Sequence, residues 1–264
     1  MKKGISVCTV VRNGLINGYP FWESLNSCLP FADEIVISEG FSDDATLKVL
    51  RKFAKQHPKK VNLFQDSWTN RKSPYGEIIA TMSTRAMKHC KHEWIYYLQA
   101  DEVVHEENHQ FLKDLASGKL GVYNSVVFQF AHFIGSWKPL PRGGAAYFEA
   151  IRMVRNRPDI KLIGDAWTFG GRIKPLFSSD LVPKPIYHLG WVFPKNIDQK
   201  NLQQAKIYPN LPGYQEKAKV ARANVRAGYT SKKGLPPEPD FNDYPKGVHR
   251  LIGMFEYKLP DGVL

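Results

Sequence analysis

A regular alternation of strand-like and helix-like segments over the first hundred residues constrains the fold more than any other feature. Short runs rich in β-branched and aromatic residues predict strands at residues 5–11, 34–38, 61–65 and 94–98. The segments between them carry apolar residues at helical spacing, and the predicted helices begin near residues 21, 42 and 77. Strands separated by helices imply right-handed crossovers. We therefore expect an α/β fold with a Rossmann-like, mainly parallel sheet flanked by helices.

The pattern changes after residue 120. Residues 125–130 and 150–154 have the composition of strands and are separated by a turn at Gly143-Gly144. Antiparallel strands can be joined without a helix between them. We expect these strands to be antiparallel additions to the sheet.

The C-terminal part has a different character. Residues 196–207 and 214–227 have helical periodicity, whereas residues 229–247 are rich in Pro, Gly and Lys. We expect residues 1–195 to form the main domain and residues 196–264 to form a helical and irregular extension of it.

Composition restricts the class of protein. Hydrophobic residues make up 43% and charged residues 23% of the 264 residues, as in an ordinary globular protein. The three cysteines lie far apart without C-x-x-C spacing, so neither a disulfide framework nor a zinc site is indicated. The sequence has no transmembrane run of 18 or more apolar residues and no signal-peptide pattern. A cytoplasmic location is the expectation.

The net charge of +12 indicates an anionic partner. Nucleotide phosphates, nucleic acid, an acidic glycan and an anionic membrane surface all fit it, so peripheral membrane contact stays open. A basic surface without any specific partner fits equally well. Charge alone does not choose among these.

Polar segments follow the predicted parallel strands, at residues 9–13, 38–44 and 99–102. In open α/β sheets the ligand binds beyond the carboxyl ends of the strands, where these segments should meet. Asp101 and Glu102 follow a strongly apolar strand, and a buried acidic pair is costly unless a cation, a donor or water faces it. Mg²⁺ and Mn²⁺ prefer such oxygens and also bind phosphates. Alternatively, Asp101 caps a helix that begins near Glu106.

Three segments in order resemble the family 2 glycosyltransferases of GT-A type. They are residues 5–14, the run DEIVISEGFSDDAT at residues 33–46, and the run WIYYLQADE at residues 94–102. In that family a first strand ends in Asn, an acidic residue precedes Ser-Thr-Asp-Gly-Thr, and a later strand runs into Asp-Ala-Asp-Glu. The resemblance covers about the first 105 residues.

The resemblance implies that the protein is a glycosyltransferase. Its donor would be a nucleotide diphosphate sugar, its acceptor a glycan, lipid-linked molecule or small molecule, and its cofactor a divalent cation, Mn²⁺ or Mg²⁺. Asp101 takes the metal position. The positions that correspond to nucleotide-binding residues are Thr9, Val11, Arg12, Glu39, Asp44, Gln99 and Ala100.

The sequence departs from the family pattern at three positions. Glu39 replaces the commoner aspartate, Ala45 replaces glycine, and Gln99 replaces the first aspartate of Asp-x-Asp. Gln99 can form hydrogen bonds but supplies no negative charge, which predicts weak metal binding in the absence of nucleotide. A pseudoenzyme that binds the nucleotide sugar without transferring it is therefore an alternative.

His188 is the second candidate metal ligand. Its segment, PIYHLGW at residues 185–191, is similar to a His-Tyr-Gly segment found late in many GT-A enzymes, where the histidine completes the metal or diphosphate site. A histidine packed in the core is the alternative reading.

Inverting transfer, which the resemblance implies, needs a carboxylate that takes the proton of the acceptor hydroxyl. Asp165 in the run LIGDAWT is the first candidate, and Glu149, beside the glycine-rich segment, is the second. A surface or capping carboxylate is the other explanation for both residues.

A nucleic-acid or polyanion-binding protein is the competing hypothesis, and it depends on charge and scattered aromatic residues. The sequence contains no helix-turn-helix, zinc-finger or RNP signature. An acidic cluster at the strand ends would also repel a phosphate backbone unless a metal intervened. We expect no specific nucleic-acid partner. The G-x-G-x-x-G and P-loop patterns are absent as well, which argues against a dinucleotide enzyme and a nucleotidyltransferase.

Overall fold

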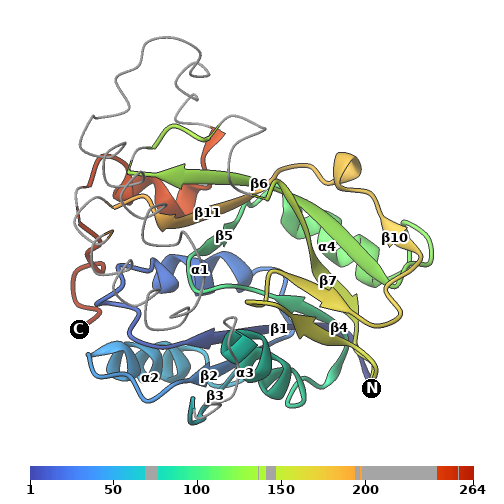
Figure 1. The fold of residues 1–264 in the computed structure, drawn as a ribbon, viewed down its shortest axis with the longest axis horizontal. Coiled ribbons are helices and arrows are strands. Elements are labelled where there is room, and N and C mark those ends of the chain that lie inside the picture. The colour runs from blue at the N-terminus through green and yellow to red at the C-terminus, as the bar shows by residue number, and fades with distance from the viewer. Residues whose placement is uncertain (69–76, 136, 141–146, 194–196, 198–242, 255) are drawn as a thin grey trace.

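The structure is a computed structural model that describes residues 1–68, 77–135, 137–140, 147–193, 197, 243–254 and 256–264 (Figure 1). The helices are α1 (Phe21–Cys28), α2 (Thr46–Gln56), α3 (Glu77–Met87) and α4 (Asn108–Ala116), with short 3-10 turns η1 (Ser179–Leu181) and η3 (Lys246–Leu251). The strands of the first half are β1 (Lys2–Val11), β2 (Glu34–Glu39), β3 (Val61–Gln65), β4 (His92–Tyr97) and β5 (Glu102–Val104). Those of the second half are β6 (Ser125–Ile134), β7 (Glu149–Arg155), β8 (Lys161–Ile163), β9 (Thr168–Gly170), β10 (Leu176–Phe177) and β11 (Ile186–Trp191).

One large sheet organises the described residues, in the order β3-β2-β1-β4-β7-β6-β11-β5. The first four strands are mutually parallel, and β7 pairs antiparallel with both β4 and β6. Strand β11 then runs parallel to β6 and antiparallel to β5. This arrangement confirms the predicted α/β class, with a Rossmann-like parallel half and antiparallel additions.

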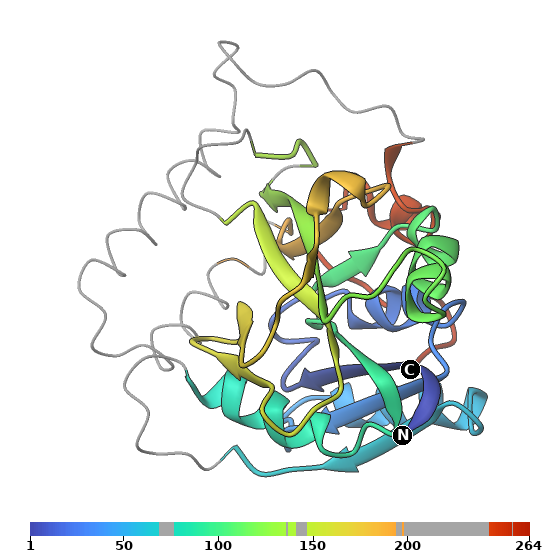
Figure 2. The same ribbon diagram turned by 90° about the vertical axis from the view of Figure 1, so that its right-hand side faces the viewer.

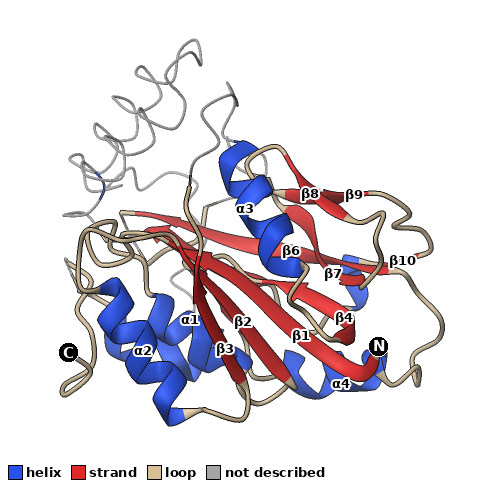
Figure 3. Ribbon diagram, turned by 90° about the horizontal axis from the view of Figure 1, so that it is seen from below, coloured by secondary structure: helices blue, strands red, loops and turns tan. Residues whose placement is uncertain are grey.

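Helices cover the sheet on both faces, as Figure 3 shows for α1, α2 and α4 on one face and α3 on the other. On α2 the apolar residues Val49, Leu50 and Phe53 recur at helical spacing, so one stripe of the helix is buried. The opposite face is covered by α3 together with the β8–β9 hairpin, which lies beside it (Figure 2). Two apolar layers result, one on each side of the central strands.

The C-terminal segment 243–264 packs against the N-terminal half. On η3, Arg250 forms an ion pair with the buried carboxylate of Glu23 on α1, and the Tyr257 hydroxyl donates to the same carboxylate at 3.0 Å. The predicted helices 196–207 and 214–227, and the predicted irregular segment up to residue 242, lie outside the described residues apart from Ile197. The division at residue 195 stays a prediction.

Within the described part of the chain, no helix is both long enough and apolar enough to cross a bilayer.

The loops that follow β1 and β2 are joined by side-chain hydrogen bonds. Thr46 Oγ1, fully buried at the start of α2, accepts from the backbone N–H groups of Gly14 (2.9 Å) and Leu15 (3.3 Å). Asp44 accepts from Ile16 N (2.9 Å) and Thr46 N (2.8 Å). Asp44 therefore lies just before α2 and holds its first N–H group, and the helix begins four residues later than the expected residue 42.

We predict that Thr46→Val destabilises the protein. The substitution keeps the volume but removes the acceptor of two backbone N–H groups, one buried and one partly buried, and the expected loss in the free energy of unfolding is about 1–3 kcal/mol. Denaturant unfolding measures it, with Thr46→Ser as the matched control that keeps the hydroxyl. Equal stabilities for the Val and Ser variants would contradict this role of Thr46.

Candidate functional site

The carboxyl ends of β1, β2 and β4 meet at one edge of the sheet, because the three strands are parallel neighbours. Asn13, Phe41 and Ala166 are the non-glycine residues with positive φ in the described chain, at 53°, 55° and 67°. All three lie in loops that border this edge. Left-handed backbone at a non-glycine residue costs free energy and concentrates at functional sites. The surrounding structure therefore holds these three residues in backbone conformations that they would rarely adopt on their own.

Glu39 is fully buried and holds the turn after β2. Its carboxylate accepts from the backbone N–H groups of Phe41 (3.1 Å) and Ser42 (2.7 Å) and from Gln65 Nε2 (2.8 Å). Next to it, Gly40 packs so closely that a Cβ would lie 2.4 Å from Trp68 Nε1. Glu39 therefore shapes the loop that the sequence assigns to the nucleotide.

Arg12 contributes positive charge at the end of β1. Its guanidinium lies 5.9 Å from the centre of the Trp68 ring, and its side chain is half-buried. Thr9 and Val11 precede it in β1 with buried side chains, and no hydrogen-bond partner for Thr9 Oγ1 occurs among the described residues. Of these predicted nucleotide contacts, Arg12 is the one whose side chain is partly accessible.

A buried ion pair underlies the turn after β4. Glu102 and Arg152 on β7 have fully buried side chains, and Arg152 Nη2 donates to Glu102 Oε1 at 2.7 Å while Nε donates to both carboxylate oxygens at 3.1 Å. Burial disfavours the charged guanidinium, but the Glu102 carboxylate and Tyr147 outweigh that effect and hold the pKa of Arg152 above its ordinary value. Arg152 is therefore a permanent buried cation.

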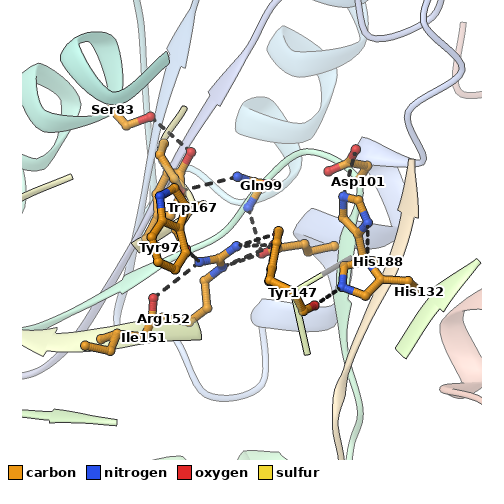
Figure 4. Close-up of polar contacts among 12 residues, drawn as sticks. Ser83, Tyr97, Gln99, Asp101, His132, Tyr147, Ile151, Arg152, Trp167 and His188 are labelled. Atoms are coloured by element: carbon orange, nitrogen blue, oxygen red, sulfur yellow. Dashed lines mark hydrogen bonds and ion pairs between the residues drawn. The ribbon is translucent and has the colours of Figure 1, made fainter. Parts of the chain in front are cut away.

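The same ion pair anchors the turn that carries Asp165. Arg152 Nη1 donates to the carbonyl of Trp167 at 2.7 Å, and Gln99 Nε2 donates to the carbonyl of Ala166 at 3.4 Å (Figure 4). Residues 164–167 form the tight connection between β8 and β9. The structure thus brings Gln99 and the Asp165 turn together, although they are distant in sequence.

Asp101 and His188 face each other beside this ion pair. His188 pairs with Glu102 in the β11–β5 ladder, and Leu189 N donates to the Asp101 carbonyl at 2.8 Å. This register places His188 Nε2 3.5 Å from Asp101 Oδ2, with Asp101 only 7% exposed. Helix α4 begins at Asn108 with Glu107 at its N-cap, so Asp101 does not cap it and that alternative is wrong.

His132 on β6 extends the arrangement, as Figure 4 shows. Its Nδ1 lies 3.0 Å from Nδ1 of His188, and its Nε2 forms a short hydrogen bond with the carbonyl of Tyr147. The ring is buried next to Phe130. Burial, and secondarily the neighbouring His188, lowers the pKa of His132 to about 3.

Tyr147 lies between the ion pair and the histidines. Its hydroxyl accepts a hydrogen bond from Arg152 Nη2 at 3.2 Å. Burial raises the pKa of this hydroxyl, and although Arg152 opposes the shift, Glu102, Asp101 and Asp165 add to it. Asp101 and Asp165 therefore both lie within electrostatic range of one side chain.

The two candidate bases occupy different surroundings. Asp165 is exposed in the anchored β8–β9 turn. Glu149 is exposed at the start of β7, where its carboxylate accepts from Ser179 Oγ of η1 at 2.6 Å. Asp165 therefore belongs to the same set of residues as Gln99, Asp101 and His188, because Arg152 and Tyr147 lie between them. The hydrogen bond with Ser179 links Glu149 to η1 instead.

Three residues of this site, Arg152, Tyr147 and His132, were not predicted from the sequence. A signal existed for Arg152, because a charged residue inside an apolar strand must meet a partner. His132 lies in the apolar run SVVFQFAHFI, where a single histidine gives no indication of what it faces.

Comparisons with known proteins found similarity only to solved structures. No family model matches the sequence, and no curated protein matches it. Among solved structures, S. aureus TarS residues 1–349 is similar, with 16% identity over 89% of this chain and 74% of that chain and a TM-score of 0.48. The same TarS fragment in complex with UDP-GlcNAc matches at 15% identity over 89% of this chain and 75% of that chain, again at 0.48. The mannosyltransferase PcManGT from Pyrobaculum calidifontis, in complex with GDP-Man and Mn²⁺, matches at 12% identity over 89% and 77%, with a TM-score of 0.39. At these scores we derive the function from the chain's own residues.

We predict that Arg152→Met lowers the free energy of unfolding by about 3–5 kcal/mol, because the Glu102 carboxylate is left buried without its partner. Adding Glu102→Gln should recover much of the loss, since it removes the unpaired charge. The matched control is Arg155→Met on the same strand, whose pair with Glu93 is partly exposed, so that the expected change is about 0–1 kcal/mol. A similar small loss in Arg152→Met, measured by denaturant unfolding, would disprove the structural role of the ion pair.

Proposed function

We propose that this protein is a GT-A type glycosyltransferase that moves a sugar from a nucleotide diphosphate sugar to an acceptor. The observation that carries the proposal is the pair of Asp101 and His188, 3.5 Å apart and almost buried, where the turn after the parallel strand β4 meets β11. A carboxylate and an imidazole at this edge of an α/β sheet fit a diphosphate site better than a packed core. The ordered sequence motifs support the same reaction.

In this proposal the nucleotide lies over the ends of β1 and β2. Arg12 supplies positive charge there, while Glu39 and Asp44 act through the loop backbone that their carboxylates hold. The remaining predicted contacts, Thr9, Val11, Gln99 and Ala100, lie at the ends of β1 and β4. Loops fixed by several hydrogen bonds bind a ligand without paying the full cost of ordering.

Asp101 and His188 fit a divalent cation. Carboxylate oxygen and imidazole nitrogen are donors that Mn²⁺ accepts, and the distance of 3.5 Å between them is longer than a usual hydrogen bond. No group of three or more His, Cys, Asp or Glu suited to a metal occurs among the described residues. The donor diphosphate would therefore supply much of the coordination, as is common for Mg²⁺. When bound, the cation would offset negative charge on the departing nucleoside diphosphate.

Asp165 is the proposed base for inverting transfer. Its turn is anchored to Gln99 and Arg152 through the carbonyls of Ala166 and Trp167, which supports a fixed backbone at Asp165. There it can take the proton of an acceptor hydroxyl while the sugar carbon is attacked. Glu149 is the second candidate. The acceptor is a glycan, a lipid-linked molecule or a small molecule, and the proposed place of action is the cytoplasm.

We predict that nucleotide and metal bind cooperatively. Titration calorimetry with UDP and with GDP, in Mn²⁺ or in EDTA, should show tighter binding with Mn²⁺ in the wild type and loss of that difference in Asp101→Ala. Asp114→Ala, on the exposed face of α4, is the control that should behave like wild type. Equal affinities for wild type and Asp101→Ala in both solutions would remove the metal assignment.

We predict that Asp165→Asn lowers sugar transfer by roughly 10²–10⁴-fold and leaves nucleotide affinity nearly unchanged, because general-base help is lost and donor contacts are not. The measurement is nucleotide release from a panel of UDP and GDP sugars, with Glu149→Gln as the matched variant. Near-normal turnover in Asp165→Asn with a sharp loss in Glu149→Gln would move the role to Glu149. Wild-type nucleotide binding without transfer across the panel and a range of acceptors would indicate the pseudoenzyme instead.

A further inference from the structure

His132 makes two hydrogen-bond contacts that together fix where its protons lie. Its Nε2 is bonded to the Tyr147 carbonyl, and a carbonyl oxygen only accepts, so Nε2 carries a hydrogen. The ring is 5% exposed, and burial disfavours its charged form. A neutral ring with a hydrogen on Nε2 has a lone pair on Nδ1.

The proton positions of His188 follow from its contact with His132. The two Nδ1 atoms are 3.0 Å apart, and such a contact needs one donor and one acceptor. Since Nδ1 of His132 is the acceptor, Nδ1 of His188 is the donor. In neutral His188 the lone pair is then on Nε2, the atom that faces Asp101 Oδ2. Two electron-rich atoms at 3.5 Å repel each other unless a proton or a cation lies between them.

We propose that His132 is a positioning residue, which holds His188 in the tautomer whose Nε2 is free to bind the divalent cation of the donor diphosphate. This inference rests on the proposed function, because it gives a role to that metal site. Histidines that bind metals commonly donate their other ring N–H to a fixed acceptor, which sets the ring orientation and the tautomer. Here the acceptor is a second histidine.

The support for His132 continues into the buried ion pair. The Tyr147 carbonyl accepts from His132, while the hydroxyl of the same tyrosine accepts from Arg152. A hydrogen-bonded path therefore runs from Glu102 through Arg152, Tyr147 and His132 to His188. Each member of the path is held by its neighbour, so the free lone pair of His188 has a fixed direction.

Two substitutions separate this role from packing. His132 stacks on Phe130 (centroids 5.7 Å apart) and meets Tyr147 edge-on (5.0 Å), so His132→Phe keeps an aromatic ring and removes both hydrogen bonds. His132→Gln keeps one acceptor and one donor. His109→Phe, a partly buried histidine on α4 that packs against Phe31, is the matched control. Thermal unfolding of the four proteins shows that each is folded.

The first test reads the tautomer directly, without metal. Long-range ¹H–¹⁵N spectra of the metal-free full chain at mildly alkaline pH should show His188 protonated at Nδ1 in the wild type and in His132→Gln. In His132→Phe the proton should move to Nε2. Assignment uses loss of the signal in His188→Gln. Protonation at Nε2 in the wild type, or an unchanged Nδ1–H in His132→Phe, would overturn the proposal.

The second test measures Mn²⁺ affinity in the presence of saturating UDP or GDP. Loss of a residue that supports a metal ligand typically weakens metal binding 10–100-fold, and we expect that loss in His132→Phe, most of it restored in His132→Gln. Unchanged Mn²⁺ affinity in His132→Phe would overturn the role of His132 and leave the metal site intact. Absence of Mn²⁺ binding in the wild type would overturn the metal site itself and this inference with it.

Discussion

The buried ion pair between Glu102 and Arg152 is the interaction on which the rest of the site depends. Removing two charges from water is costly, and the pair is tolerable because the guanidinium meets the carboxylate through both Nε and Nη2 and finds further acceptors at Trp167 and Tyr147. Because these hydrogen bonds engage the guanidinium in several directions, the pair is held in a single geometry. It ties β5 to β7 and fixes both the Asp165 turn and the tyrosine that supports His132.

The proposed chemistry follows from how this framework distributes charge. Loops at the ends of β1 and β2 are locked by Glu39, Asp44 and Thr46, so the nucleotide side of the site is preorganised. Asp101 and His188 stand on the other side, held by the ladder of β5 and β11. In this arrangement a cation at Asp101 and His188 can bind the diphosphate, and the carboxylate of Asp165 can act on the acceptor hydroxyl.

Sequence patterns predicted the local elements, because the periodicity of a strand or helix depends on neighbouring residues alone. Residues 61–65, for example, form β3 with the predicted bounds. The patterns also predicted that Asp101 lies at a strand end. They did not predict the contact of His132 with His188, since it depends on the register of β6 against β11, strands 56 residues apart at this pair. In the sequence, Gln99 replaces an aspartate of the family pattern and so removes a negative charge. The structure gives it a partner, the Ala166 carbonyl, which a carboxylate would repel.

Crystals grown with Mn²⁺ and UDP or GDP test the metal site most directly, because anomalous diffraction at the manganese edge locates the ion. We expect an anomalous peak within bonding distance of both Asp101 Oδ and His188 Nε2, with the diphosphate completing the coordination. A nucleotide bound at the ends of β1 and β2 with no manganese beside Asp101 and His188, or a peak elsewhere in the molecule, would contradict it.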